Sequence, residues 1–257
     1  MVPSSMPSTP RATPSADRSH RQAFGRKIAR RRPLGRRLRR FALLVILIGV
    51  LLPVPFVIAY RFVPPPITPL MVIRSASGAS LDKHWLPLGR ISAALPRAVI
   101  ASEDEKFCTH RGFDWVAFEN AYRDWRAGRE PKGASTITMQ VAKNLFLWPG
   151  RSVIRKGFEA YLTVLLELFW DKHRIMEVYL NVIEWGDGVY GADAAAHRYF
   201  NKPASALTPQ EAALLAAVLP NPREWSPARP TSYIAERAAI IREAMPAMAV
   251  PSANGCR

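Results

Sequence analysis

An uncharged run of twenty residues, "FALLVILIGVLLPVPFVIAY", occupies positions 41–60. As a helix that rises ~1.5 Å per residue, such a run spans ~30 Å, about the hydrocarbon core of one bilayer. The run therefore predicts an uncleaved transmembrane anchor. A cleaved signal peptide is the alternative, but the run is long for one and no small-x-small cleavage site follows it. Pro53 and Pro55 leave open whether the helix kinks or ends early.

Basic residues lie on one side of this run. Positions 1–40 hold twelve Lys or Arg and one acid, Asp17, and so carry most of the formal net charge of +16. By the positive-inside rule, this segment is a cytoplasmic tail and the chain after residue 60 lies outside the cytoplasm. Contact with anionic lipid explains the tail better than nucleic-acid binding, because Phe24 is its only aromatic residue.

Composition divides the rest of the chain. The Ser-, Pro- and Thr-rich start of the chain predicts that the tail is disordered. After the apolar run, "RFVPPPITPL" predicts a stiff proline-rich spacer over 61–69. A folded domain is expected over 70–245, followed by a C-terminal tail over 246–257. The two cysteines are too few for a disulfide scaffold and fit no zinc site, so we expect Cys108 to be a small apolar filler.

Helical periodicity dominates the expected domain. In "RSVIRKGFEAYLTVLLELFW", apolar residues recur at three- and four-residue steps from Ile154 to Phe169, which predicts one core-facing side. "LTPQEAALLAAVLP" carries both helix ends: Thr208 and Glu211 form a capping box, and Pro220 follows the last turn. The best strand signal is "PLMVIRS", residues 69–75. Pattern alone predicts a mainly α domain.

Four segments could carry chemistry, and each has an ordinary structural explanation. "SEDEKFCTHRGFD" (102–114) resembles a solvated helix start, and "KGASTITMQVAKN" (132–144) a cap or turn. In "RKGFE" (155–159) an Arg and a Glu share a helix face, which is usually a weak surface ion pair. The fourth segment is "YLNVIEWGDGVYGADAAAHRYF" (179–200). Singly, none of them establishes a function.

Together, the order and spacing of these segments resemble the peptidoglycan glycosyltransferases, the enzymes that polymerise lipid II. The family blocks appear as "EDEKFCTHRG", "GASTITMQVAKN", "RKGFE" and "EVYLN" with "GDGVYG", over roughly residues 92–226. Ala134 replaces the second glycine of the usual pair, and Met139 stands where glutamine is common. No Ser-x-x-Lys or Lys-Thr-Gly motif of a penicillin-binding transpeptidase occurs, so the monofunctional form is the closest match.

The resemblance implies a lysozyme-like helical domain on a single N-terminal transmembrane helix, with that domain in the periplasm and the helix in the inner membrane. It also implies site roles. Glu103 is the general base and Glu159 the second important carboxylate, with a possible metal-binding role. Donor-diphosphate or sugar contacts fall to Lys143, Arg151, Arg155, Ser135, Gln140 and Asn144, and Asp104, Phe107 and His110 support the loop.

The chemistry accounts for these residue types. A sugar 4-hydroxyl attacks poorly until a carboxylate takes its proton, and we expect Asp104, Glu105 and burial to raise the pKa of Glu103. The departing diphosphate needs cations, which Lys and Arg supply. A divalent cation, Mg²⁺ or Mn²⁺, is expected, with no organic cofactor. The expected partners are lipid II, the growing glycan chain, the membrane and cell-wall synthesis or division proteins, without nucleic acid.

Other roles stay open. His110 is a loop support, which is favoured, or else a second base or a metal ligand. The apolar stretch Asn144–Gly150 is either core or a lipid-touching flap. The nearest alternative function is a lytic transglycosylase that cleaves the glycan, which has no diphosphate to neutralise and no need of the cation cluster. A non-catalytic membrane scaffold is the other, and it gives no reason for four blocks in this order.

Overall fold

The computed structural model describes residues 34–130, 133–150 and 152–256. The chain divides into two units, residues 1–46 and 47–257, and each is described by itself. The described part of the first unit is helical and belongs to α1 (Leu34–Leu51). This helix begins inside the segment predicted to be a disordered basic tail, so that prediction is wrong from Leu34 onward. Residues 1–33 of the tail lie outside the described residues.

One helical run within the described residues, Leu38–Tyr60, is long and apolar enough to cross a membrane. α2 (Pro53–Tyr60) follows α1 directly, and Leu52 between them keeps helical dihedral angles of φ −58° and ψ −39°. Pro53 and Pro55 fall in the first turn of α2, where backbone N–H groups have few helical partners in any case. The prolines therefore do not end the helix early.

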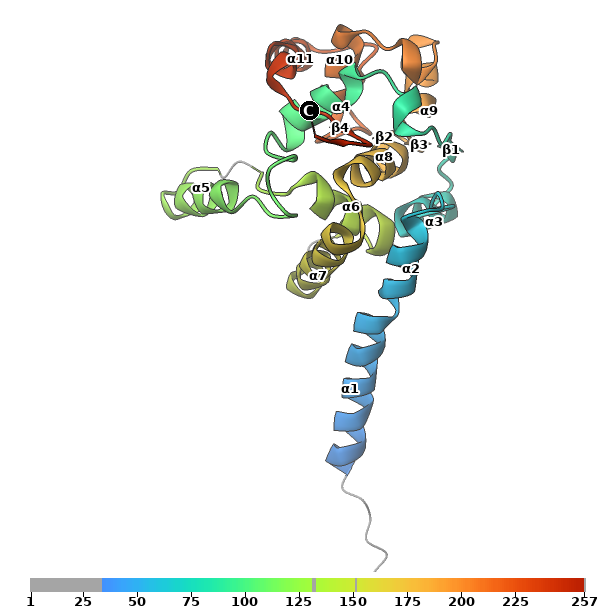
Figure 1. The fold of residues 1–257 in the computed structure, drawn as a ribbon, viewed down its shortest axis with the longest axis vertical. Coiled ribbons are helices and arrows are strands. Elements are labelled where there is room, and N and C mark those ends of the chain that lie inside the picture. Colours follow the sequence, from blue (N-terminus) through green and yellow to red (C-terminus); the bar gives the residue numbers. More distant parts are fainter. Residues whose placement is uncertain (1–33, 131–132, 151, 257) are drawn as a thin grey trace, which may run out of the picture. The chain divides into compact units, whose positions relative to one another are not determined.

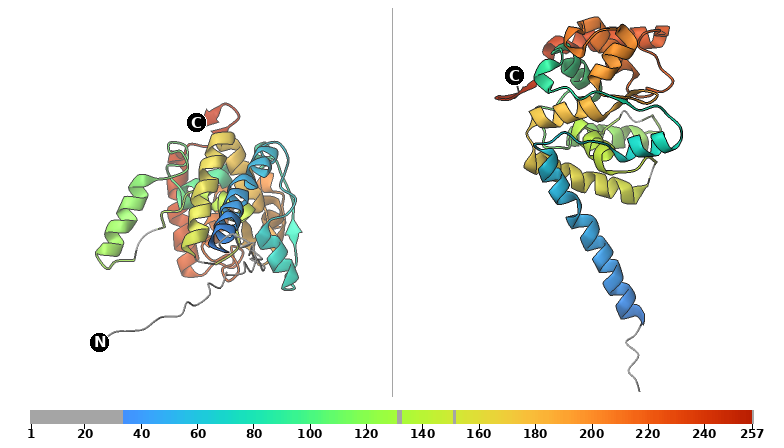
Figure 2. Two further views of the ribbon diagram at one scale, coloured as in Figure 1. Left: turned by 90° about the horizontal axis from the view of Figure 1, so that it is seen from below. Right: turned by 90° about the vertical axis from the view of Figure 1, so that its right-hand side faces the viewer.

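Two helical layers make up most of the second unit (Figures 1 and 2). One layer contains α4 (Ala94–Glu103), α10 (Pro209–Val218) and α11 (Ser232–Ala244), and the other contains α6 (Ile137–Phe146), α7 (Val153–Phe169) and α8 (Lys172–Val182). α8 is buried from Ile175 to Val182 and forms the centre of the core. Glu103 ends a helix of the first layer, while Lys143 lies on a helix of the second.

Side-chain caps fix where these helices begin. The predicted capping box of α10 is confirmed, since Thr208 and Glu211 each satisfy the other's backbone N–H. α6 begins after Thr136, whose hydroxyl accepts from Met139 N at 3.2 Å. α7 and α8 begin in the same way after Ser152 and Asp171. The site helices therefore start at defined residues, which fixes which face each side chain occupies.

The remaining elements are short or peripheral. α5 (Trp115–Arg126) has no buried residue, whereas α9 (Ala192–Phe200) buries its alanines. Three 3₁₀ turns cover Leu88–Arg90, Ala204–Ala206 and Met245–Ala247. A small sheet has the order β1-β3-β2, with β1 (Asp82–Lys83) parallel and β2 (Glu184–Gly186) antiparallel to β3 (Val189–Tyr190). Gly188 turns between β2 and β3 at φ +73°, and a Cβ there would lie 2.1 Å from Ser80 O.

The predicted strand at 69–75 is wrong, because this segment forms α3 (Pro69–Ala76). The hydroxyl of Thr68 accepts from Met71 N at 3.3 Å, and Pro69 occupies the first helical position. A proline preset for the first turn and a threonine cap favour a helix. These local signals outweigh the β-propensity of the apolar residues.

The proline-rich segment packs against the domain and is not a free spacer. Lys83 Nζ donates to Pro65 O and Pro66 O at 2.6 and 2.9 Å. Arg174 donates to Tyr60 O and Val63 O, each at 2.8 Å. The end of α2 and the segment that follows it are therefore held by side chains of the domain.

A disulfide corrects the expectation for the cysteines. Cys108 bonds to Cys256 across 148 residues. Cys256 belongs to β5 (Gly255–Cys256), which pairs with β4 (Pro251–Ser252) in a hairpin that packs on α8. The C-terminal segment is thus a β-hairpin held to the domain by a disulfide, and Cys108 is one partner of that disulfide and not only an apolar core residue.

We expect removal of this disulfide to lower thermal stability. Closing a loop of 148 residues contributes up to about 5 kcal/mol in the chain-entropy model. The double variant Cys108→Ser/Cys256→Ser should unfold about 10–20 °C below the wild-type protein by circular dichroism in detergent. Dithiothreitol should lower the Tm of the wild type and leave that of the variant unchanged. Equal Tm values for the two oxidised proteins would contradict the assignment.

Candidate active site

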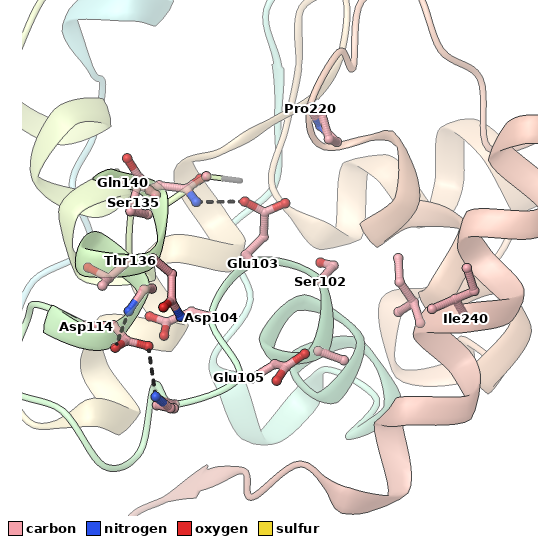
Figure 3. A pocket seen from close by; sticks show the side chains of 18 of the residues that line it. Ser102, Glu103, Asp104, Glu105, Asp114, Ser135, Thr136, Gln140, Pro220 and Ile240 are labelled. Atoms are coloured by element: carbon pink, nitrogen blue, oxygen red, sulfur yellow. Dashed lines mark hydrogen bonds and ion pairs between the residues drawn. The ribbon is translucent and has the colours of Figure 1, made fainter. Parts of the chain in front are cut away.

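Glu103 stands at the last residue of α4 and meets α6 across the junction of the two layers. Its Oε2 accepts from Gln140 Nε2 at 2.8 Å, and Figure 3 shows this bond spanning the two elements. Tyr179 of α8 donates to Gln140 Oε1 at 3.3 Å. The bond from Tyr179 therefore orients the amide of Gln140 so that its NH₂ group points at the Glu103 carboxylate.

Asp104, the residue after Glu103, also connects the end of α4 to the start of α6. Its Oδ2 accepts from Ile137 N at 2.9 Å, at the start of α6, and its Oδ1 lies 2.8 Å from His110 Nε2. Gly112 N donates to His110 Nδ1 at 3.1 Å, so the ring proton is on Nε2 and is donated to Asp104. Asp104 and His110 thus hold the loop after Glu103, and Phe107 fills the core beneath it.

Burial raises the pKa of Glu103 above its ordinary value. The hydrogen bond from Gln140 and the charges of Arg237 and Lys143 act in the opposite direction, and Asp104 adds a smaller upward push. The acidic neighbours Asp104 and Glu105 were both expected to help raise this pKa. Glu105 is exposed and has no part in the shift, so burial is the main cause.

A cleft of about 1060 Å³ opens beside Glu103. One wall is a mixed face of α5 that includes Val116, Asn120 and Asp124, and the opposite wall is α11 with Arg237 and Ile240. The loop before α6 brings Ser135 and Thr136 to the rim. The cleft is wide enough for sugar rings, and one carboxylate with a raised pKa lines it.

A cluster of charges from α6 and α7 includes Lys143, which acts electrostatically on Glu103. Glu159 of α7 is 2% exposed, and its two oxygens accept from Arg155 Nη1 at 2.7 Å and Lys156 Nζ at 2.5 Å. Lys143 is within electrostatic reach of Glu159, Arg155 and Glu103. Loss of water around the Lys143 ammonium lowers its pKa although the side chain keeps solvent contact, and Glu159 opposes that shift.

A second cavity, of about 420 Å³, borders this cluster. Its lining includes Asn144, three cations (Lys143, Arg155 and Arg223) and one acid, Glu184, so its net charge is positive. Asn144 Nδ2 donates to Gln140 O at 2.9 Å, which continues the chain of contacts from Glu103. The predicted site residue Arg151 lies outside the described residues.

The stretch Asn144–Gly150, expected to be either core or an exposed flap, contains both buried and exposed residues. Leu145 and Leu147 are buried in the core, whereas Trp148 is 49% exposed. Phe146 stacks on Tyr60 at a ring-centroid distance of 6.2 Å. The first half of the stretch is therefore core, with Phe146 at the end of α2, whereas Trp148, Pro149 and Gly150 are exposed and line the second cavity.

Sequence reasoning missed two arginines. Arg237 of α11 lines the first cleft and acts on the charge of Glu103, and Arg223 lines the second cavity. Both lie far along the chain from the motifs, and no local pattern singles them out. Only the packing of α11 and of the segment after α10 brings them to the site.

A divalent ion bound by protein ligands does not fit the described residues. They contain no group of three or more His, Cys, Asp or Glu side chains that could hold a metal ion. Glu159, the proposed ligand, already has a cation on each oxygen. A metal would have to displace Arg155 or Lys156 from this carboxylate.

The comparisons with known proteins agree with the predicted helical, lysozyme-like fold. The sequence pattern of the family described as Transglycosylase matches residues 71–246. A protein from Caulobacter vibrioides named biosynthetic peptidoglycan transglycosylase is 55% identical over 209 residues, which cover 81% of this chain and 91% of that protein. One of the same name from Rhodospirillum centenum is 57% identical over 211 residues, covering 82% and 91%. The chain therefore belongs to the transglycosylase family.

Proposed function

We propose that this protein polymerises lipid II into linear β-1,4 glycan strands and releases polyprenyl diphosphate, with inversion at the donor anomeric carbon. The observation that carries the proposal is the closeness of one half-buried carboxylate, Glu103, to a cation cluster of Lys143, Arg155 and Lys156. The names of the relatives from C. vibrioides and R. centenum support the same reaction class.

Glu103 acts as the general base in this proposal. The raised pKa strengthens the carboxylate as a proton acceptor. Gln140 holds one oxygen, and the other is free to meet the acceptor 4-hydroxyl in the cleft. As that proton moves to Glu103, the acceptor oxygen attacks the anomeric carbon of the donor from the face opposite the diphosphate.

The cations stabilise the leaving group. Charge develops on the diphosphate as the glycosidic bond forms, and preorganised donors in a partly desolvated site stabilise that charge strongly. Lys143 and Arg155 line the second cavity, where Asn144 adds an amide. Glu159 orients Arg155 and Lys156 through its two oxygens. The expectation of Mg²⁺ or Mn²⁺ stays a prediction, and no step is assigned to it.

The proposed location is the inner membrane, with the N-terminus in the cytoplasm and the catalytic domain in the periplasm. The basic tail supports this orientation. The Cys108–Cys256 disulfide supports it independently, because disulfides persist in the periplasm and are rare in the cytosol.

The reaction is tested directly with labelled lipid II. The purified full-length chain should convert it to polymer that a muramidase digests to disaccharide units. Fragments from finished glycan, without polymer from lipid II, would indicate the lytic alternative and refute the proposal.

Replacing the base should abolish turnover without unfolding the domain. Glu103→Gln keeps the shape and the neighbouring hydrogen-bond partner but cannot accept the proton, so polymerisation should fall at least ~100-fold. Glu105→Gln is the matched control, since Glu105 is exposed in the same loop and should keep near wild-type activity. Normal strand synthesis by Glu103→Gln would refute the role of Glu103.

Removing one of the cations that stabilise the departing diphosphate should slow turnover by about as much as one charge-assisted hydrogen bond contributes. Lys143→Ala should reduce kcat/KM for lipid II by ~10–100-fold. Lys202→Ala serves as the control, because Lys202 pairs with Glu211 near α10 and lines neither cavity. Unchanged turnover by Lys143→Ala would argue against diphosphate binding at this residue.

The pH profile should respond to Arg237. Its positive charge lowers the pKa of Glu103, so Arg237→Met should raise that pKa and move the acid limb of the pH–rate profile to higher pH. Activity would then be lost earlier as the pH falls. Arg242→Met on the same helix, where Arg242 bonds to Gln210, should leave the limb in place. A limb that stays in place or moves to lower pH in Arg237→Met would contradict this account of Glu103.

A further inference from the structure

The loop that follows Glu103, residues 104–112, is bonded covalently to the C-terminal end of the chain. Cys108, in the middle of this loop, forms a disulfide with Cys256. The side chain next to it, Phe107, is fully buried. The stretch of backbone between Glu103 and the disulfide is therefore short, and a movement at the cysteine reaches the residues around the carboxylate.

The C-terminal segment 245–256 also packs on two helices that carry site residues. Its 3₁₀ turn Met245–Ala247 contacts α4, the helix that ends at Glu103. Its hairpin β4–β5 contacts α8, the helix whose Tyr179 orients Gln140. Figure 1 shows this segment in red beside α4 and α8. The segment thus meets the loop and both helices at once.

The hairpin has hydrogen bonds of its own. The Ser252 hydroxyl donates to Gly255 O at 2.7 Å and accepts from Asn254 N at 3.3 Å. Cys108 Sγ also lies 3.5 Å from Ala249 O, just before the hairpin. Because a disulfide sulfur has no proton to donate, this approach is a packing contact. The end of the chain is therefore a structured attachment point for the loop.

Further contacts of the loop lead to the second helical layer. Asp104 accepts from Ile137 N at the start of α6. Lys172 Nζ, at the start of α8, lies 4.6 Å from the centroid of the Phe107 ring. These contacts are non-covalent and reversible. The bond at Cys108 adds a covalent tie to a different part of the chain.

We propose that the C-terminal segment 245–256 is a positioning element of the site: through the Cys108–Cys256 bond it holds the loop so that the Glu103 carboxylate stays against Gln140. Neither cysteine lines the cleft, so both are positioning residues. Opening the bond releases the loop from the segment and leaves the two-layer core in place. The effect on turnover rests on the proposed function, whereas the tie itself rests on the contacts of the segment.

A positioning role differs from a purely stabilising one in what it does to the folded enzyme. A disulfide that served stability alone would act mainly on the unfolded chain. Burial is the main cause of the raised pKa of Glu103, so a loosened loop should admit water and lower that pKa toward its ordinary value. Arg237, Lys143 and Asp104, which also act on this carboxylate, stay in the protein. The acid limb of the pH–rate profile should therefore move to lower pH.

Turnover at a temperature where every form is folded tests the positioning role. Full-length wild type and Cys108→Ser/Cys256→Ser are assayed with labelled lipid II in detergent, with and without dithiothreitol. As dithiothreitol opens the bond, its thiols become a ring disulfide and each cysteine sulfur gains an electron and a proton. We expect kcat to fall about tenfold in the variant and in the reduced wild type, with KM changed by less than about twofold, because a small misplacement near the chemistry is costly. Reoxidation should restore the wild type and leave the variant slow.

Thr208→Ala is the matched control for lost stability. It removes the capping box of α10 and so lowers the Tm, but Thr208 lies in neither the loop nor the C-terminal segment. Its kcat and acid limb should match those of the wild type. Wild-type kcat and an unmoved acid limb in the double variant would overturn the proposal, since the bond would then serve stability alone. An equal loss of kcat in Thr208→Ala would overturn it as well.

Amide hydrogen exchange separates the tie from the reaction. Reduction of the wild type should speed exchange in residues 104–112 by about fivefold or more and leave exchange in α10 unchanged. Equal exchange in the oxidised and reduced forms would overturn the proposal whatever the activity. Faster exchange in the loop, with no polymer from the oxidised wild type, would instead refute the proposed function and support the tie.

Discussion

The carboxylate of Asp104 is the contact on which the arrangement of the site depends. It accepts from Ile137 N at the start of α6 and from His110 in the loop that follows α4. Two helices from different layers are thereby joined one residue after Glu103. Because an orphan N–H at a helix start needs an acceptor, this bond also fixes the register of α6. That register places Gln140 against Glu103 and puts Lys143 three residues further along the same face of α6.

The consequence is a carboxylate and a cation cluster held close together by one helix. Glu103 is half-buried beside Gln140 of α6, where burial raises its pKa, and Lys143 lies three residues further along the same face of that helix. Arg155 and Lys156 of α7 are paired with Glu159 and not with Glu103. In the proposed reaction, Glu103 accepts the proton while these cations stabilise the departing diphosphate.

Local signals in the sequence predicted much of this and failed where distant segments meet. The capping box of α10 was readable because it depends on residues three positions apart, whereas Glu103, Gln140 and Lys143 were singled out by the resemblance of whole motifs to a known family. The Cys108–Cys256 bond and Arg237 could not be predicted, since their partners are brought close only by folding. The segment 69–75 misled because its strand-like composition is overruled by a Thr68 cap.

The pH dependence of kcat/KM for lipid II tests the central claim most directly, because it reports the ionisation of the free enzyme. The account predicts an acid limb with an apparent pKa above 4.5, the ordinary value for a glutamate, and the absence of this limb from the residual activity of Glu103→Gln. A limb at or below 4.5, or one that persists unchanged in the variant, would contradict the assignment of Glu103 as the buried base.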